Sequence, residues 1–358
     1  MIPAARPEIG EDERAAVDRV LRSGMLAQGP EVAAFESEFA AIVDGRSCIA
    51  LNSGTSALHL AFLAGGIGPG DEVIVPSFSF AATANAVSLT GATPVFVDIE
   101  TDYFSIDPAA VEAAITPRTK AIMPVHLYGH PSDLVALKAI ADKHDLQIYE
   151  DAAQAHAASV NGIPVGAWGV AGSFSFYPTK NMMSGEGGMI TTGSEHLERQ
   201  ARMLRNQGME RRYENEVIGF NMRMTDIHAA IGRVQLSKLA GWTAKRQANA
   251  AFLNENLMGV VTPPTAPGAV HVYHQYTVRI VDHDRDAFAE ELSKRGVGNG
   301  VYYPTPIHRL PSFGLDLDLP VTEQVAGEVL SLPVYPSLSD DELATIVETV
   351  NAVAKAGA

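Results

Sequence analysis

Residues 72–98 read EVIVPSFSFAATANAVSLTGATPVFVD: a short apolar run, a longer helix-like stretch and a second short apolar run. EVIVP (72–76) and PVFVD (94–98) predict strands, and the residues around 79–90 predict a helix between them. Two strands joined by a helix are typical of a parallel unit, because parallel strands need a long crossover connection. This stretch therefore predicts an α/β fold.

The same alternation continues on both sides, from about residue 47 to residue 192. The expected strands are CIAL (48–51), KAIMPV (120–125), LQIYED (146–151), GSFSFY (172–177) and GMITT (188–192). The further expected helices lie around 55–65, 108–115 and 131–144. This order predicts a mostly parallel sheet with helices on both faces.

Beyond residue 194 the pattern changes to that of a smaller α+β unit. The expected elements are a helix from near His196, a helix at 225–239, a strand at 274–280, a helix near 285–295, a VYY segment at 301–303 and a helix from about Asp340 to Ala354. A chain of 358 residues exceeds one ordinary core. We expect a large domain at 1–240, which includes the N-terminal segment, and a small C-terminal domain at 241–358.

Composition narrows the classes of function. The formal net charge is −16, from 26 basic and 42 acidic side chains, which argues against nucleic-acid binding. Cys48 is the only cysteine, so an intrachain disulfide and a cysteine-based zinc site are excluded, and we expect no metal. The sequence has neither a run of about 18 apolar residues nor a signal peptide pattern, so we expect no membrane span and a soluble, cytoplasmic protein.

Ligands of doubly wound sheets bind beyond the carboxyl ends of the strands, where three stretches are expected to meet. The first is NSGTSA (52–57), which follows a strand and opens a helix. Its backbone N–H groups could hold a phosphate, and helix capping by Ser53 or Thr55 explains the same residues equally well. Neither GxxxxGK[ST] nor GxGxxG occurs in the chain.

The second stretch is EDAAQAH (150–156), at the end of an expected buried strand. A carboxylate at Asp151 needs a cation or a protonated ring nitrogen beside it, or it serves as a helix cap or in a salt bridge. We interpret His156 as a hydrogen-bonded core residue in preference to a catalytic one.

The third stretch is SFSFYPTKNMMSGEGG (173–188). Pro178 ends the expected strand and directs Lys180 into the loop, where apolar neighbours would lower the affinity of its amine for a proton. Such an amine can attack a carbonyl, whereas a lone lysine is usually a surface charge. A phosphate cradle, a carboxylate for a pyridinium and a lysine for an aldehyde are together the contacts of a pyridoxal phosphate site.

Six segments together resemble the DegT/DnrJ/EryC1/StrS family, from about residue 27 to the C-terminal helix: NSGTSAL, VPSFSFAATANAV, EDAAQAHAA, SFSFYPTKNMMSGEGGM, GFNMRMTDIHAAIGRVQL and SLPVYPSLSDDEL. The resemblance implies the aspartate aminotransferase-like fold type I and a homodimer with active sites at its interface. It also implies pyridoxal 5'-phosphate and transfer of an amino group, with L-glutamate as the donor, to a nucleotide-linked keto-sugar.

The resemblance also implies roles for single residues. Lys180 would form the Schiff base with the cofactor and shuttle the proton, and Asp151 would pair with the pyridine nitrogen. The remaining cofactor contacts would be Gln154 beside the ring, Phe80 stacked on it, Gly54, Thr55 and Ser175 at the phosphate, and Asn221 from the other subunit. Residues expected on the substrate side are Arg223, Tyr303 and His308.

Other functions remain open at this point. The acceptor could be a keto-cyclitol, and a non-catalytic pyridoxal-phosphate-binding regulator would use the same fold. A nucleotide-binding module would leave Lys180 on the surface. A branch of the family that dehydrates sugars has histidine in place of the lysine, so Lys180 favours transamination.

Overall fold

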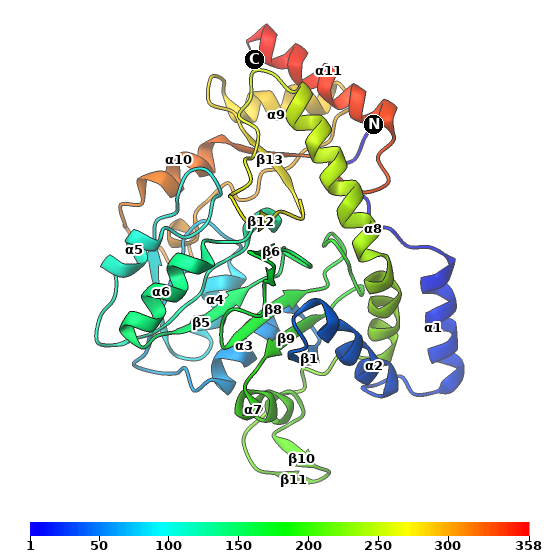
Figure 1. The fold of residues 1–358 in the computed structure, drawn as a ribbon, viewed down its shortest axis with the longest axis vertical. Coiled ribbons are helices and arrows are strands. Elements are labelled where there is room, and N and C mark those ends of the chain that lie inside the picture. The colour runs from blue at the N-terminus through cyan, green and yellow to red at the C-terminus, as the bar shows by residue number, and fades with distance from the viewer. Residues whose placement is uncertain (358) are drawn as a thin grey trace.

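A seven-stranded sheet lies at the centre of the computed structural model, which describes residues 1–357 (Figure 1). The strand order is β1-β9-β8-β5-β4-β2-β3, and within this sheet β9 runs antiparallel to both its neighbours while the other pairings are parallel. The strands are β1 (Ser47–Leu51), β2 (Glu72–Pro76), β3 (Thr93–Val97), β4 (Thr119–Ile122), β5 (Gln147–Asp151), β8 (Ala171–Ser175) and β9 (Gly188–Thr192). The mostly parallel α/β sheet is confirmed.

Helices cover both faces of the sheet because side chains of the strands alternate between two apolar layers. Val73 and Val75 of β2 pack into one layer, and Ile74 between them packs into the other. The first layer is covered by α3 (Gly54–Ala64), α4 (Ala82–Ser88) and α7 (Glu195–Arg205). The second is covered by α5 (Pro108–Ala113) and α6 (Leu134–His144) and, nearer to β1, by α2 (Pro30–Phe39).

A second apolar core lies above the sheet in Figure 1, around the C-terminal part of the chain. It is built by the end of α8 (Asp226–Asn256), the antiparallel pair β13 (Tyr276–Arg279) and β14 (Val329–Leu332), α9 (Arg285–Lys294) and α11 (Asp340–Ala356). Ile2 from the N-terminus also packs there. The expected domain boundary near residue 240 falls inside α8, which runs continuously from one core to the other, and the boundary stays a prediction.

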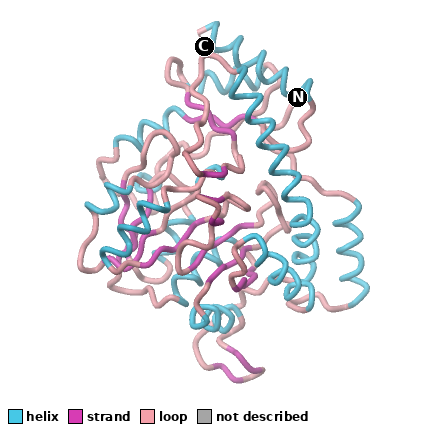
Figure 2. The backbone as a smooth tube through the Cα atoms, in the orientation of Figure 1, coloured by secondary structure: helices cyan, strands magenta, loops and turns pink. Residues whose placement is uncertain are grey.

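The remaining elements are short or peripheral, and the tube in Figure 2 shows how much loop connects them. They are α1 (Glu11–Ser23), α10 (Pro320–Glu328), η1 (Ala40–Ile42), η2 (Leu127–Gly129), η3 (Ile307–Arg309), β6 (Ser159–Val160), β7 (Ile163–Pro164) and β12 (Ala269–Val270). A hairpin of β10 (Met209–Arg211) and β11 (Glu214–Asn215) projects at the bottom of Figure 1. Within residues 1–357, every helix is too short or too polar to span a lipid bilayer.

Several strands end earlier than the sequence predicts. β4 stops at Ile122, two residues before Pro124, and β8 stops at Ser175 because the chain then turns into the loop of Lys180. The segment 301–303 is not a strand: Gly300 makes a single bridge to Ser331 and the chain then leaves the ladder. Apolar composition alone does not show where pairing stops.

Candidate active site

Asp151 is the last residue of β5 and is buried, with 5% of its surface exposed. The hydroxyl of Thr83 donates to its Oδ2 at 2.9 Å, and the backbone N–H of Ala153 donates to its Oδ1 at 3.2 Å. Burial raises the pKa of Asp151, and the two hydrogen bonds and the nearby charge of Lys180 oppose that rise. Within residues 1–357 no basic side chain forms an ion pair with this carboxylate, so a cationic ligand group would stabilise it.

Thr83 is a site residue that sequence reasoning missed. It lies in α4, is fully buried, and its hydroxyl also contacts the Ser79 hydroxyl at 2.8 Å. Two hydroxyl side chains four residues apart share one side of a helical turn, and in VPSFSFAAT (75–83) that spacing is the signal that could have found them. Thr83 holds the Asp151 carboxylate in one orientation.

Lys180 follows β8 in a turn closed by a hydrogen bond from its backbone N–H to the Tyr177 carbonyl at 2.9 Å. Its side chain is half-buried. Burial lowers the pKa of its amine to about 8, although the charge of Asp151 acts in the opposite direction. The unprotonated amine therefore exists near neutral pH, as a nucleophile or base requires.

Gln154, Tyr303 and Phe80 come together from distant parts of the chain. Gln154 accepts the Tyr128 backbone N–H on Oε1 at 2.7 Å and donates from Nε2 to the Tyr303 hydroxyl at 3.2 Å. The ring centroids of Phe80 and Tyr303 lie 5.7 Å apart, and Phe80 is 56% exposed. An exposed phenylalanine beside a glutamine–tyrosine pair forms an open aromatic wall that can receive a planar ligand.

The start of α3 supports both interpretations of the NSGTSA stretch. Ser53 is the N-cap and accepts the Ser56 N–H at 3.1 Å, whereas the N–H groups of Gly54 and Thr55 have no acceptor within residues 1–357. Ser175 lies directly against Gly54, since a Cβ there would stand 2.7 Å from the Ser175 Cβ. Capping and an anion cradle therefore coexist, and only glycine fits the contact.

Three predicted residues make no hydrogen bond to Asp151, Gln154 or Lys180 within residues 1–357. The segment 221–223 lies beside the end of β1, where Arg223 bridges to Leu51. Asn221 is exposed and makes a backbone bridge to Asn206, whose side chain also accepts Arg223 Nη1 at 2.8 Å. His308 is fully buried, with Nδ1 2.6 Å from the Ser77 hydroxyl and Nε2 3.3 Å from Glu323. The cofactor contact of Asn221 and the substrate contacts of Arg223 and His308 stay predictions.

His156 is a core residue, but the hydrogen bond expected for it is absent. Its ring packs against the rings of Phe174 and Phe176, at centroid distances of 5.4 and 5.6 Å, and neither ring nitrogen has a partner within residues 1–357. Burial lowers the pKa of His156 to about 3, so the ring is neutral.

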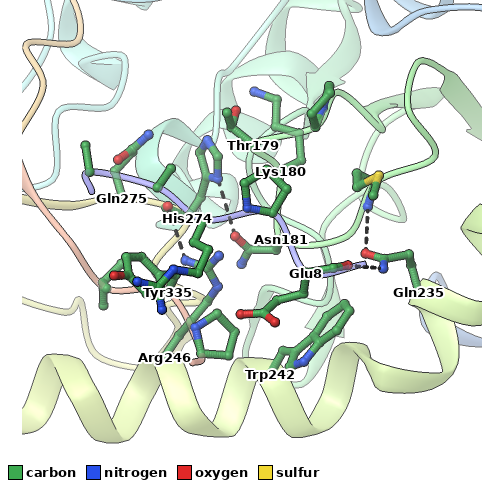
Figure 3. A pocket seen from close by; sticks show the side chains of 18 residues that line it. Glu8, Thr179, Lys180, Asn181, Gln235, Trp242, Arg246, His274, Gln275 and Tyr335 are labelled. Atoms are coloured by element: carbon green, nitrogen blue, oxygen red, sulfur yellow. Dashed lines mark hydrogen bonds between the residues drawn. The ribbon is translucent and has the colours of Figure 1, made fainter. Parts of the chain in front are cut away.

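A small cavity adjoins the lysine loop on the side of α8 (Figure 3). It is lined by Lys180, Arg246 and Tyr335, among others, and has a volume of about 30 Å³. That is room for about two water molecules and not for a sugar.

Comparison with known proteins identifies the family of this chain. Residues 7–351 match the model of the DegT/DnrJ/EryC1/StrS aminotransferase family. The chain belongs to this family. It is 44% identical to the dTDP-3-amino-3,4,6-trideoxy-alpha-D-glucose transaminase of Streptomyces venezuelae, over 98% of this chain and 94% of that protein. It is 42% identical to the UDP-N-acetyl-3-dehydro-alpha-D-glucosamine 3-aminotransferase of Acidithiobacillus ferrooxidans, over 93% and 91% of the two chains.

Solved structures of family members have the same fold. The structure of DesV from S. venezuelae in complex with a ketimine intermediate aligns with a TM-score of 0.93 at 44% identity, over 96% of this chain and 95% of that one. The PLP form of the sugar aminotransferase Spr1654 from Streptococcus pneumoniae aligns with a TM-score of 0.95 at 29% identity, over 100% and 99%. The aminotransferase fold and the family resemblance are both confirmed.

The residues present fit pyridoxal phosphate. Asp151 offers a buried anion to a protonated pyridine nitrogen, and the free N–H groups of Gly54 and Thr55 offer donors to a phosphate. Lys180 offers an amine of lowered pKa to the aldehyde. The pyridine nitrogen, the phosphate and the aldehyde of the cofactor thus each have a matching partner on one edge of the sheet.

Proposed function

We propose that this chain binds pyridoxal phosphate at Lys180 and transfers an amino group from an amino acid to the ketone of a nucleotide-linked sugar. One observation carries the proposal: a buried carboxylate at Asp151 and a lysine of pKa about 8 occur in the same site, together with the free N–H groups at the start of α3. Membership of an aminotransferase family supports the reaction class.

Each group has a distinct task in this proposal. The bound cofactor supplies an electron-withdrawing ring that acidifies the carbon bearing the transferred amine. Asp151, oriented by Thr83, keeps the pyridine nitrogen protonated. Lys180 would remove and return the proton of the carbon that bears the transferred amine, since its pKa near 8 suits both directions. Gln154 and Phe80 hold the ring in place.

The acceptor is a sugar with a ketone at carbon 3. Two relatives above 40% identity support this choice, because the name of each places the amine at that carbon, on a dTDP sugar in one case and a UDP sugar in the other. L-Glutamate is the donor, by family resemblance, and the reaction takes place in the cytoplasm.

The protein acts as a homodimer in this proposal. The segment that carries Asn221 follows the projecting hairpin. Tyr213 in the hairpin turn is 79% exposed, and Ile218 after the hairpin is 94% exposed. Apolar side chains this exposed favour contact with another protein surface. A second copy that covers the hairpin would receive Asn221 at its own phosphate end.

The test separates cofactor attachment from substrate choice. Protein given pyridoxal phosphate is reduced with borohydride, and peptide mapping should place the adduct on Lys180. Turnover of a separate, unreduced sample is followed as 2-oxoglutarate release from L-glutamate, with 3-keto and 4-keto nucleotide sugars and keto-inositols as acceptors. An adduct on another amine would refute the cofactor assignment. Faster turnover with a keto-inositol would change the assigned acceptor from a nucleotide sugar to a cyclitol.

A further inference from the structure

The residue after the lysine is buried and uses both ends of its amide. Asn181 is 4% exposed, donates from Nδ2 to the Val272 carbonyl at 2.9 Å, and has its Oδ1 3.3 Å from His274 Nδ1 (Figure 3). Because the amide nitrogen is taken by a carbonyl, the oxygen faces the ring and His274 carries its proton on Nδ1. Asn181 thus joins the lysine loop to the segment 272–275.

That segment is itself fixed to the turn at 127–129. The Val272 N–H donates to the Gly129 carbonyl at 3.1 Å, and the Gln275 N–H donates to the Tyr128 carbonyl at 3.2 Å. The two backbones approach so closely that a Cβ on Gly129 would lie 2.9 Å from the backbone nitrogen of His274, and Gly129 has a φ of +96°. The contact therefore requires glycine at this turn.

The same turn binds Gln154, whose Oε1 accepts the Tyr128 N–H at 2.7 Å. A continuous series of hydrogen bonds therefore runs from Asn181 through the segments 272–275 and 127–129 to Gln154. Arg246 adds to it from α8, donating from Nη1 to the Tyr273 carbonyl at 3.1 Å. The loop that carries the amine and the side chain expected beside the cofactor ring share one frame.

We propose that Asn181 is a positioning residue for Lys180: it sets where the amine stands relative to Gln154 and Asp151. This inference rests on the role of Lys180 in the proposed function. Without the amide, Lys180 remains attached to a turn closed by its own N–H but loses the anchor to the rest of the site. A displacement of about 1 Å can reduce a rate by about 10²-fold.

The test uses Asn181→Ala with Asn249→Ala as its matched control. Asn249 is also a buried amide, 1% exposed, and donates to the Tyr335 carbonyl at 3.1 Å, outside the series. Lys180 is reductively methylated in cofactor-free protein over a range of pH, and peptide mass mapping reports the midpoint. The wild-type midpoint should lie near the lowered pKa of about 8. In Asn181→Ala it should rise by about one unit toward the ordinary value, while Asn249→Ala stays at the wild-type midpoint.

A second measurement uses the loaded enzyme. Asn181→Ala should lower kcat by about tenfold or more with little change in KM, because the amine is misplaced while substrate binding surfaces remain. Should Asn181→Ala fail to fold, His274→Leu removes one of the two bonds and should shift the methylation midpoint in the same direction by less. His274→Gln restores an N–H donor and should return the midpoint toward wild type.

Two results would overturn the inference: a wild-type midpoint in Asn181→Ala, or an equal shift in Asn249→Ala, which would reveal general loosening. Methylation needs neither cofactor nor turnover, so its outcome is independent of the proposed function. If borohydride fixes no cofactor on Lys180, the proposed function fails whatever the midpoints are.

Discussion

Two regions assigned to one site differ in how completely a single chain builds them. Around Asp151, the carboxylate is buried and held by Thr83, and Gln154 is held at both ends of its amide. The segment around Asn221 is open, because Asn221 is exposed and the nearby Ile218 is 94% exposed. One chain therefore fixes the side chains around Asp151 by itself, whereas in the proposed dimer a second copy would cover the segment around Asn221.

The comparison fails outright if the buried region does not perform the chemistry. Lys180→Ala should reduce turnover by about 10³-fold or more and abolish the borohydride adduct, because the only amine assigned to attack and proton transfer is gone. Lys180→Arg is the control: it keeps a cation in the loop and should be equally inactive. Activity near wild type in either variant would remove the chemistry from this region.

Asp151→Asn tests whether the buried charge itself matters. We expect about a 10²-fold loss of turnover, because a neutral amide no longer keeps a pyridine nitrogen protonated. The charge of Asp151 raises the pKa of Lys180, so its removal should lower the methylation midpoint below about 8 in cofactor-free protein. Asp226→Asn is the control, since Asp226 is also buried but caps the N–H groups of Gly29 and Val32. An unchanged midpoint in Asp151→Asn would contradict the coupling.

Thr83→Val tests the hydrogen bond to Asp151 in the same region, because valine has a shape similar to that of threonine but lacks the hydroxyl. A hydrogen bond to a charged group contributes about 1.5–3 kcal/mol, so we expect turnover to fall about tenfold. Thr322→Val is the control, because that hydroxyl is buried without a partner within residues 1–357 and its loss should not reduce stability. Turnover in Thr83→Val equal to that in the control would mean that Asp151 needs no orienting partner.

The smallest expected effect concerns the open region. Asn221→Ala should weaken cofactor binding about fivefold, which corresponds to one hydrogen bond of about 1 kcal/mol. Asn351→Ala on α11 is the control and should bind normally. Mixing Asn221→Ala subunits with Lys180→Ala subunits should create some sites of wild-type affinity, as a contact across the interface demands. If no such sites form in a proven mixed dimer, Asn221 acts within its own chain or not at all.

Much of the architecture could be predicted from local sequence. The strands β2, β5 and β9 lie close to where their apolar runs predict, because continuous apolar segments are buried on both faces of a parallel sheet. Strand ends were predicted less well: β8 ends at Ser175, where pairing with β9 stops, although apolar residues continue. Hydrophobicity reports burial, whereas a strand ends where its partner does.

The sequence could place the main residues of the candidate site together for a similar reason. Lys180, Asp151 and the start of α3 each follow a strand, and the carboxyl ends of parallel strands meet at one edge. Thr83 was missed because its bond to Asp151 joins residues 68 positions apart in the chain, and the ring nitrogens of His156 find no partner within residues 1–357. Which polar atoms find partners depends on neighbours from elsewhere in the chain.

The order of residues alone was enough for the α/β class and for the aminotransferase family, because both are encoded in short segments of the chain. Only the folded chain brings Asn181 to Val272 and Gln154 to Tyr303, across about 90 and 150 residues of sequence. Such contacts depend on the relative placement of two cores and their connecting turns. No local pattern carries that placement, because it is decided by packing summed over the whole molecule.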